Sequence, residues 1–357
     1  MATVASVAPQ GSALQAEVPA PYIPKTRQSS VPGQRTYNGK PFPLVLESQF
    51  VEGEDASDVV KWVKEHQQEI ATLLKDHGAI VLQHFPIHGG EDVSQFVKVL
   101  PWSDFKYVNG AASRQQIAER VATASEMAPQ YEIYPHHELA QSTNFPDVLL
   151  FYGDVVPQTG GETPLLHSVE LYNRVKEACP KFIEALETKG YRTERYYPAE
   201  DKPLAVVGRS WKSAFYSDDK AVVEAELKRL NLEWEWTEDG GLKTNVVVPG
   251  IRAHPLTGEK ALFTHLLGDF YAFIRDVEFE GLPRGHSEAK YTIDDFEITR
   301  EIKQTIVDIA EELLVVFPHA NGQIILVDNY TAMHGRKPFV GARRTLASLF
   351  TANYPKA

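Results

Sequence analysis

The chain has 357 residues, of which 43% are hydrophobic, and this is enough for a large buried core. Its formal net charge of −12 at pH 7 argues against a nucleic-acid partner, because binding to a phosphate backbone needs clustered Lys and Arg. The single cysteine, Cys179, excludes an internal disulfide, and no run approaches the roughly 18 apolar residues of a membrane span.

The first segment differs in composition from the rest of the chain. Residues 1–35 are rich in Ala, Pro, Ser and Gln and contain few large apolar residues, which predicts a flexible N-terminal arm. The basic and apolar parts of a signal peptide are missing from its first twenty residues, so we expect a cytoplasmic protein. We find no interdomain linker after the arm and therefore predict a single domain over residues 36–357. The oligomeric state cannot be read from the sequence.

Helical and strand-like patterns alternate along this domain. Apolar spacing predicts helices over residues 58–75, 91–100, 169–190, 221–230 and 291–317. The last of these begins with Thr292 and Asp295 in a capping-box-like arrangement. Predicted strands cover 79–85, 148–152, 323–328 and 343–351, with a hairpin over 232–248. Short strands separated by helical insertions indicate a mainly β protein, a jelly roll flanked by helices.

A histidine and a glutamate stand two residues apart where the pattern becomes strand-like. On an extended strand His136 and Glu138 point to one face, while His137 points to the other. An imidazole and a carboxylate on one face supply two of the three ligands of a facial metal triad. The same pair is also compatible with a surface or hydrogen-bonded histidine. A third ligand is needed to favour the metal site.

That ligand is available after the predicted core strand 323–328. His334 follows this strand and can close a metal site from the opposite edge of a barrel. Arg343 and Arg344 come about ten residues later, and a guanidinium matches a dicarboxylate co-substrate bidentately. Thr163 follows the glycines of Gly160-Gly161 and can present a hydroxyl to the same carboxylate.

These segments in this order resemble one family. From about Lys40 to Phe350 the chain is similar to the clavaminate-synthase-like, taurine-dioxygenase-like oxygenases that depend on iron(II) and 2-oxoglutarate. The segments that carry the resemblance are PHHELAQ, GGETPL, GRSWKSAF, WTEDGGLKT, DNYTAMH and RRTLASL. The resemblance implies a double-stranded β-helix, a jelly roll of the cupin-like kind.

The resemblance also implies roles for individual residues. His136, Glu138 and His334 would be the catalytic iron ligands. Thr163 and Arg344 would hold the distal carboxylate of 2-oxoglutarate, with Arg343 as the alternative anchor. Dioxygen would be the second co-substrate, ascorbate would support activity, and succinate and carbon dioxide would be released.

The primary substrate is predicted only as a class. We expect a small polar acid or amino acid in which one unactivated C–H bond is oxidised, by hydroxylation, desaturation or ring closure. Candidate substrate contacts are Arg114 and Lys212 as anion anchors and Trp211 as an apolar wall. Ser348 stands where the taurine-type enzymes carry a substrate-binding arginine, which argues against an alkyl-sulfonate substrate.

Two other functions remain open from the residues alone. A zinc hydrolase could use the same three ligands, although the sequence offers no assignment for its general base. A non-catalytic jelly roll that binds ligands is the second alternative. The intact set of three metal ligands, a threonine and an arginine argues against it, since a binding module does not need all five.

Overall fold

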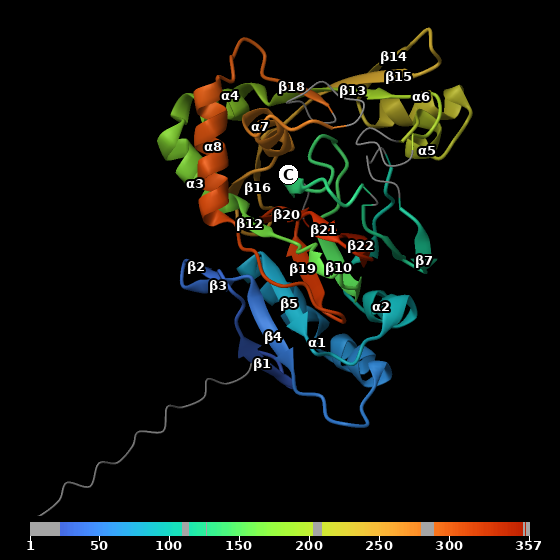
Figure 1. Ribbon diagram of the computed structural model, residues 1–357, viewed down its shortest axis with the longest axis vertical. Helices are drawn as coiled ribbons and strands as arrows, with labels where there is room; N and C mark the ends of the chain where they lie inside the picture. The colour runs from blue at the N-terminus through green and yellow to red at the C-terminus, as the bar shows by residue number, and fades with distance from the viewer. Residues whose placement is uncertain are drawn as a thin grey trace, which may run out of the picture.

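The computed structural model describes residues 22–108, 114–125, 127–202, 209–279, 289–352 and 354. Within these residues a nine-stranded mixed sheet forms the centre of the molecule (Figure 1). Its strand order is β1-β4-β5-β19-β10-β22-β8-β7, and β6 pairs with β22 outside this path. These strands are β1 (Thr26–Ser29), β4 (Leu44–Ser48), β5 (Ala79–Gln83), β6 (Ser103–Asp104), β7 (Gln116–Ala118), β8 (Val121–Thr123), β10 (Val148–Val155), β19 (Ile324–Asp328) and β22 (Arg344–Thr351).

A smaller sheet packs against this one and carries the site described below. It has the strand order β12-β20-β9, with β9 (Ile133–His136), β12 (Leu165–His167) and β20 (Ala332–Arg336). A buried cluster joins the two sheets, because Leu165 and Ala332 pack with Leu149, Phe151 and other inward-facing side chains of the large sheet. Two sheets with their apolar faces together form the sandwich expected of a jelly roll. Two-stranded pairs extend the fold: β2 (Arg35–Tyr37) with β3 (Lys40–Phe42), β11 (Thr159–Gly160) with β21 (Phe339–Val340), and β16 (Ile251–Ala253) with β17 (Lys260–Leu262).

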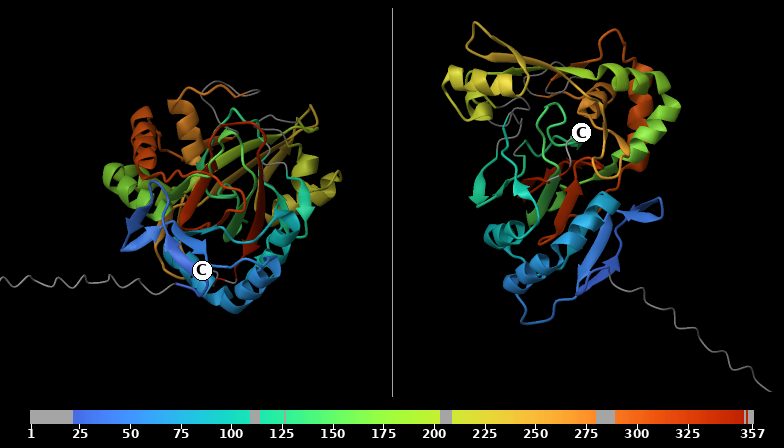
Figure 2. Two further views of the ribbon diagram at one scale, coloured as in Figure 1. Left: turned by 60° about the horizontal axis from the view of Figure 1, so that its bottom comes forward. Right: turned by 180° about the vertical axis from the view of Figure 1, so that it is seen from behind.

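Helices cover the remaining faces. α1 (Ala56–His77) and α2 (Gly89–Lys98) pack on the outer face of the large sheet (Figure 2). At the other end of the molecule lie α3 (Ser168–Ala178), α4 (Pro180–Lys189), α7 (Leu266–Ile274) and α8 (Arg300–Leu313) (Figures 1 and 2). In the part of the chain that the structure describes, no helix is both long and apolar enough to cross a membrane.

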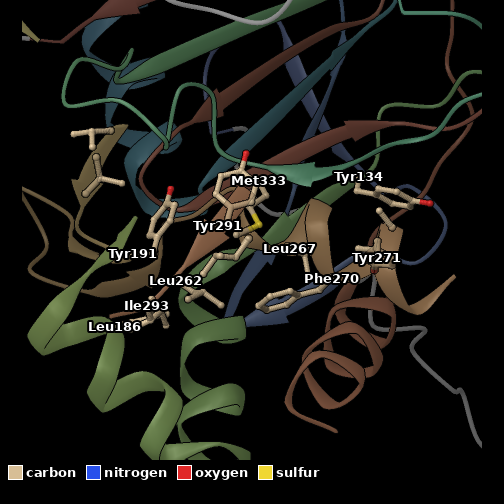
Figure 3. Close-up of a cluster of buried hydrophobic side chains, with 14 of the residues drawn as sticks. Tyr134, Leu186, Tyr191, Leu262, Leu267, Phe270, Tyr271, Tyr291, Ile293 and Met333 are labelled. Carbon is tan, nitrogen blue, oxygen red and sulfur yellow. The ribbon is translucent and has the colours of Figure 1, made fainter. Parts of the chain in front are cut away.

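A four-stranded sheet closes the upper end of the molecule. It has the order β14-β15-β13-β18, with β13 (Tyr191–Tyr197), β14 (Glu233–Trp236), β15 (Leu242–Val248) and β18 (Lys290–Thr292), and it lies beside α5 (Trp211–Phe215) and α6 (Lys220–Arg229). Its buried face joins the helical core. In Figure 3 the rings of Tyr134 and Tyr271 lie together, and they are stacked with centroids 4.6 Å apart. This contact ties α7 to β9, next to the site.

The architecture confirms the predicted fold class, a mainly β jelly roll with flanking helices. The hairpin around Gly240 and the strands near 148–152, 323–328 and 343–351 are also confirmed. One correction concerns the N-terminal arm. Residues 22–35 do not form part of a free arm, because β1 pairs with β4 and the Trp62 indole donates a hydrogen bond to the Pro24 carbonyl at 2.7 Å. Residues 1–21 lie outside the described part of the chain.

Two predicted helices were wrong in extent. The helix expected over 169–190 is broken at Cys179, since Pro180 begins a new helix and has no N–H to continue the first. The helix expected over 291–317 begins only at Arg300, where the Thr299 side chain caps it by accepting from Ile302 N–H. Thr292 instead ends strand β18.

Candidate metal centre

Two histidines are brought together by strand register. β9 and β20 are antiparallel, and His136 of β9 stands directly opposite His334 of β20. Their ring centroids are 4.5 Å apart. His136 Nδ1 lies 2.8 Å from the Tyr134 carbonyl oxygen, which can only accept, so Nδ1 carries the proton. Nε2 of His136 therefore presents its lone pair and is available as a ligand atom.

Glu138 completes the group from just beyond the end of β9. Its Oε2 is 3.6 Å from His334 Nε2. One potential ligand atom from each of His136, Glu138 and His334 lies within 4.8 Å of the others. Two imidazoles and one carboxylate on one side of a point form the donor set of a facial triad, with open positions opposite. The residues present therefore fit a divalent metal such as iron(II).

The electrostatics of the group favour the protonation states that bind metals. Burial opposes ionisation of Glu138, but the Arg114 guanidinium and His334 outweigh it and hold the pKa of Glu138 well below its usual value. Arg114 Nη2 lies 3.3 Å from Glu138 Oε2. Burial, together with the neighbouring His136, lowers the pKa of His334 to about 4. An ionised carboxylate beside neutral imidazoles is the form that coordinates a cation.

The neighbouring histidines differ in position. His137 points away from the group, as strand parity predicts: its Nε2 is 3.0 Å from Ser168 Oγ and its ring stacks on Phe263. His265 was missed by the sequence reasoning. It stands before α7 with its ring centroid 5.1 Å from that of His136, and burial holds its pKa well below the usual value. No motif marks His265, because it reaches the site from an element 129 positions after His136.

The two arginines after His334 take different positions. Arg343 lies beside the Gly160-Gly161 turn, where its Nε donates to the Gly161 carbonyl at 2.9 Å. A Cβ on Gly161 would lie 3.0 Å from the Arg343 side chain, so the glycine permits this approach. Arg344 instead lies at the surface with 55% of its side chain exposed, in an ion pair with Asp154. Thr163 is buried in the same loop as Gly161.

The structure places the candidate substrate contacts in different parts of the molecule. Arg114 lies at the metal group, stacked over the Tyr107 ring at 4.3 Å. Lys212 forms a surface ion pair with Glu200. Trp211 donates from its indole to the Gly240 carbonyl at 3.1 Å and packs on Trp236 within the core of the upper end.

Ser348 also has a partner of its own, since its hydroxyl donates to the Arg120 carbonyl at 2.7 Å. On β22 it shares a strand face with Leu346 and Phe350, which pack toward α1 and α2. Ala347 and Leu349 face the interior of the sandwich. Of the four candidates, only Arg114 contacts a member of the metal group in the described residues.

The fold and the family match define a 2-oxoglutarate-dependent dioxygenase. The chain belongs to the taurine catabolism dioxygenase TauD, TfdA family, whose model matches residues 39–350. It is 32% identical over 327 residues to a clavaminate synthase-like protein of Arabidopsis thaliana, and the match covers 90% of this chain and 97% of that protein. It is 28% identical over 301 residues to the dapdiamide synthesis protein DdaC of Enterobacter agglomerans, covering 81% of this chain and 86% of that one.

Among solved structures, the chain resembles PvcB, an iron- and alpha-ketoglutarate-dependent oxygenase from an isonitrile synthetic pathway. The TM-score is 0.50 at 14% identity, with 96% of this chain and 95% of that chain covered. At this identity the likeness shows the fold. The family match and the sequence relatives confirm the predicted family and enzyme class.

Proposed function

We propose that the protein binds iron(II) on His136, Glu138 and His334 and oxidises one C–H bond of a small polar acid or amino acid. One observation carries the proposal, the convergence of these three side chains within 4.8 Å inside a fold of this family. Bound iron(II) would supply the redox chemistry that couples decarboxylation of 2-oxoglutarate to substrate oxidation. For a hydroxylation, substrate, 2-oxoglutarate and dioxygen give hydroxylated substrate, succinate and carbon dioxide.

The distal carboxylate of 2-oxoglutarate is assigned to Arg343 and Thr163. We expected Arg344 for this role from the family pattern, with Arg343 as the alternative. The placement of Arg343 beside Gly161 and of Arg344 against Asp154 favours Arg343. Strand alternation gives the same preference: Arg343 continues the face of β22 that holds Thr345 and Ala347. Ala347 is the register partner of Phe151, whose ring lies 4.8 Å from that of His334.

An anionic group on the substrate is assigned to Arg114. Its side chain is only 11% exposed and lies beside the metal group, where a substrate must be held for its C–H bond to be oxidised. Lys212 and Trp211 stay substrate contacts proposed from the sequence alone, because both side chains have partners away from Glu138. The same holds for Ser348.

The proposal is tested by following succinate formation under air with iron(II), 2-oxoglutarate and ascorbate. Small amino acids and related acids are screened for stimulation above the slow substrate-free rate. We expect the wild-type protein to form succinate and at least one compound of this class to accelerate it. Omission of ascorbate should shorten the period of activity. Absence of succinate in a metal-loaded protein would refute the oxygenase function.

A second measurement separates this function from a hydrolase on the same ligands. A hydrolase would work with zinc and without dioxygen. Substrate conversion should therefore stop when zinc replaces iron(II) or when dioxygen is removed. Conversion that continues in a zinc-loaded, anaerobic sample would favour the hydrolase.

A further inference from the structure

The three metal-group residues are not held in the same way. His136 and His334 are register partners in a β ladder, so hydrogen bonds between β9 and β20 fix their backbones. Glu138 lies two residues past the end of β9, and the next residue, Leu139, has a left-handed φ of 57°. The ladder has therefore ended before Glu138. Its buried N–H and C=O need partners from elsewhere, since buried backbone groups without them are costly.

The side chain of Asn329 supplies both partners. The N–H of Glu138 donates to Asn329 Oδ1 at 2.9 Å, and Asn329 Nδ2 donates to the Glu138 carbonyl at 3.1 Å. One carboxamide thus pairs with Glu138 as a neighbouring strand would. Asn329 Nδ2 also donates to the Pro146 carbonyl at 2.8 Å, so the same group closes the loop that follows Glu138. Asn329 is fully buried, and solvent cannot replace these bonds.

Asn329 itself is held firmly. It lies between β19 and β20, five residues before His334. Its own N–H donates to the Asp147 carbonyl at 2.9 Å. The preceding residue, Asp328, accepts from the N–H of Tyr330 at 2.8 Å and lies 3.0 Å from His254 Nε2 through its other oxygen. The carboxamide is therefore fixed to the chain segment that leads directly to His334.

We propose that Asn329 is a positioning residue for the metal centre, which holds Glu138 in its coordinating place in the absence of a strand partner. The inference rests on the proposed function of the three ligands as a metal site. It gives Asn329 a role separate from metal ligation, because its side chain bonds only backbone groups. Loss of an outer partner that orients a metal ligand lowers metal affinity by about 10–100-fold.

Two substitutions remove different parts of the contact. Asn329→Asp keeps the shape and the acceptor for the Glu138 N–H but loses the donor to the carbonyls of Glu138 and Pro146. Asn329→Ala removes all three bonds. The matched control is Ser94→Ala, because buried Ser94 donates to the Glu119 carbonyl at 2.8 Å in a different part of the fold. This control loses a buried hydrogen bond without a change near Glu138.

The probe is cobalt(II), which is stable in air and whose visible absorption reports the geometry of its ligands. Cobalt(II) affinity, the absorption spectrum and the thermal midpoint of the metal-free protein are measured for each variant. We expect both Asn329 variants to bind cobalt(II) about 10–100-fold more weakly with an altered spectrum. Ser94→Ala should lower the thermal midpoint and leave affinity and spectrum unchanged.

The outcomes separate this inference from the proposed function. If the wild-type protein binds no cobalt(II) at a single site, the metal site itself is refuted. If the wild-type protein binds and both variants match its affinity and spectrum while losing only stability, Asn329 is structural and the inference is overturned. Should Asn329→Ala fail to fold, the isosteric Asn329→Asp decides the question by the same two measurements.

Discussion

Replacing Arg343 by alanine should raise the 2-oxoglutarate requirement much more than the same change at Arg344. The pKa of Arg343 is lowered to about 10, chiefly by burial, and the nearby Glu162 opposes this shift only in part. Among the described residues, its guanidinium makes one hydrogen bond, from Nε to the Gly161 carbonyl. The terminal nitrogens are thus available for a bidentate carboxylate.

The size of the effect follows from this burial. Truncating one partner of a buried charge pair costs roughly 2–5 kcal/mol. At about 1.4 kcal/mol per tenfold, the KM for 2-oxoglutarate should rise between roughly 30-fold and a few thousand-fold. Arg344 is 55% exposed and bonded to Asp154, and exposed pairs contribute at most about 1 kcal/mol after solvent screening. Its removal should change the KM by only a few-fold.

The assay is succinate formation at varied 2-oxoglutarate with saturating iron(II) and, once known, saturating primary substrate. Arg343→Lys is the intermediate variant, because it keeps the charge and loses the planar fork. The KM for the primary substrate should stay nearly constant in all three proteins. A large rise in the 2-oxoglutarate KM for Arg344→Ala, with Arg343→Ala unchanged, would refute the assignment.

Three further predictions concern single side chains. His334→Ala should abolish cobalt(II) binding in an equilibrium titration, whereas His137→Ala should retain it, because His137 bonds Ser168 on the other face; equal binding by both variants would contradict the ligand set. Arg114→Ala should reduce succinate formation triggered by primary substrate, and Lys212→Ala should leave it unchanged, since Lys212 pairs with Glu200 at the surface; the reverse result would move the anion anchor to α5. The last prediction is that acid destabilises the fold through His167, whose pKa burial lowers to about 4 from 6.5. The unfolded state then binds more protons below pH 6.5, so stability falls as pH drops from about 6.5 to 4, by up to roughly 3 kcal/mol. Protonation also removes the Nδ1 acceptor that caps α3. His167→Asn keeps a capping oxygen without titrating, and its urea-unfolding free energy should depend less on pH in that window; an unchanged slope would assign the acid sensitivity elsewhere.

The metal ligands could be proposed from the sequence because their chemistry is local. An imidazole and a carboxylate two positions apart, with a later histidine after an apolar strand, need only residue types and order to suggest a triad. The argument from strand parity was sufficient for His137, which does point away. It was incomplete for Glu138, since β9 ends at His136 and the carboxylate is positioned by a loop and by Asn329. The hydrogen bonds of the Asn329 side chain all go to backbone groups, and no pattern of residue types in the sequence marks such bonds.

The order of motifs in the sequence determined the family and with it the jelly roll and the class of reaction. Which of Arg343 and Arg344 faces inward was decided by the tertiary structure. Strand alternation separates the two side chains, but only the packing of β22 shows that the face of Ala347 and Leu349 is turned to the interior. The arrival of His265 beside His136 was likewise decided by packing, through the stacking of Tyr134 on Tyr271 that docks α7 on β9. Sequence periodicity reports which residues share a face of one element. Contacts between elements far apart in the chain depend on how their surfaces fit together, and only the folded structure contains that information.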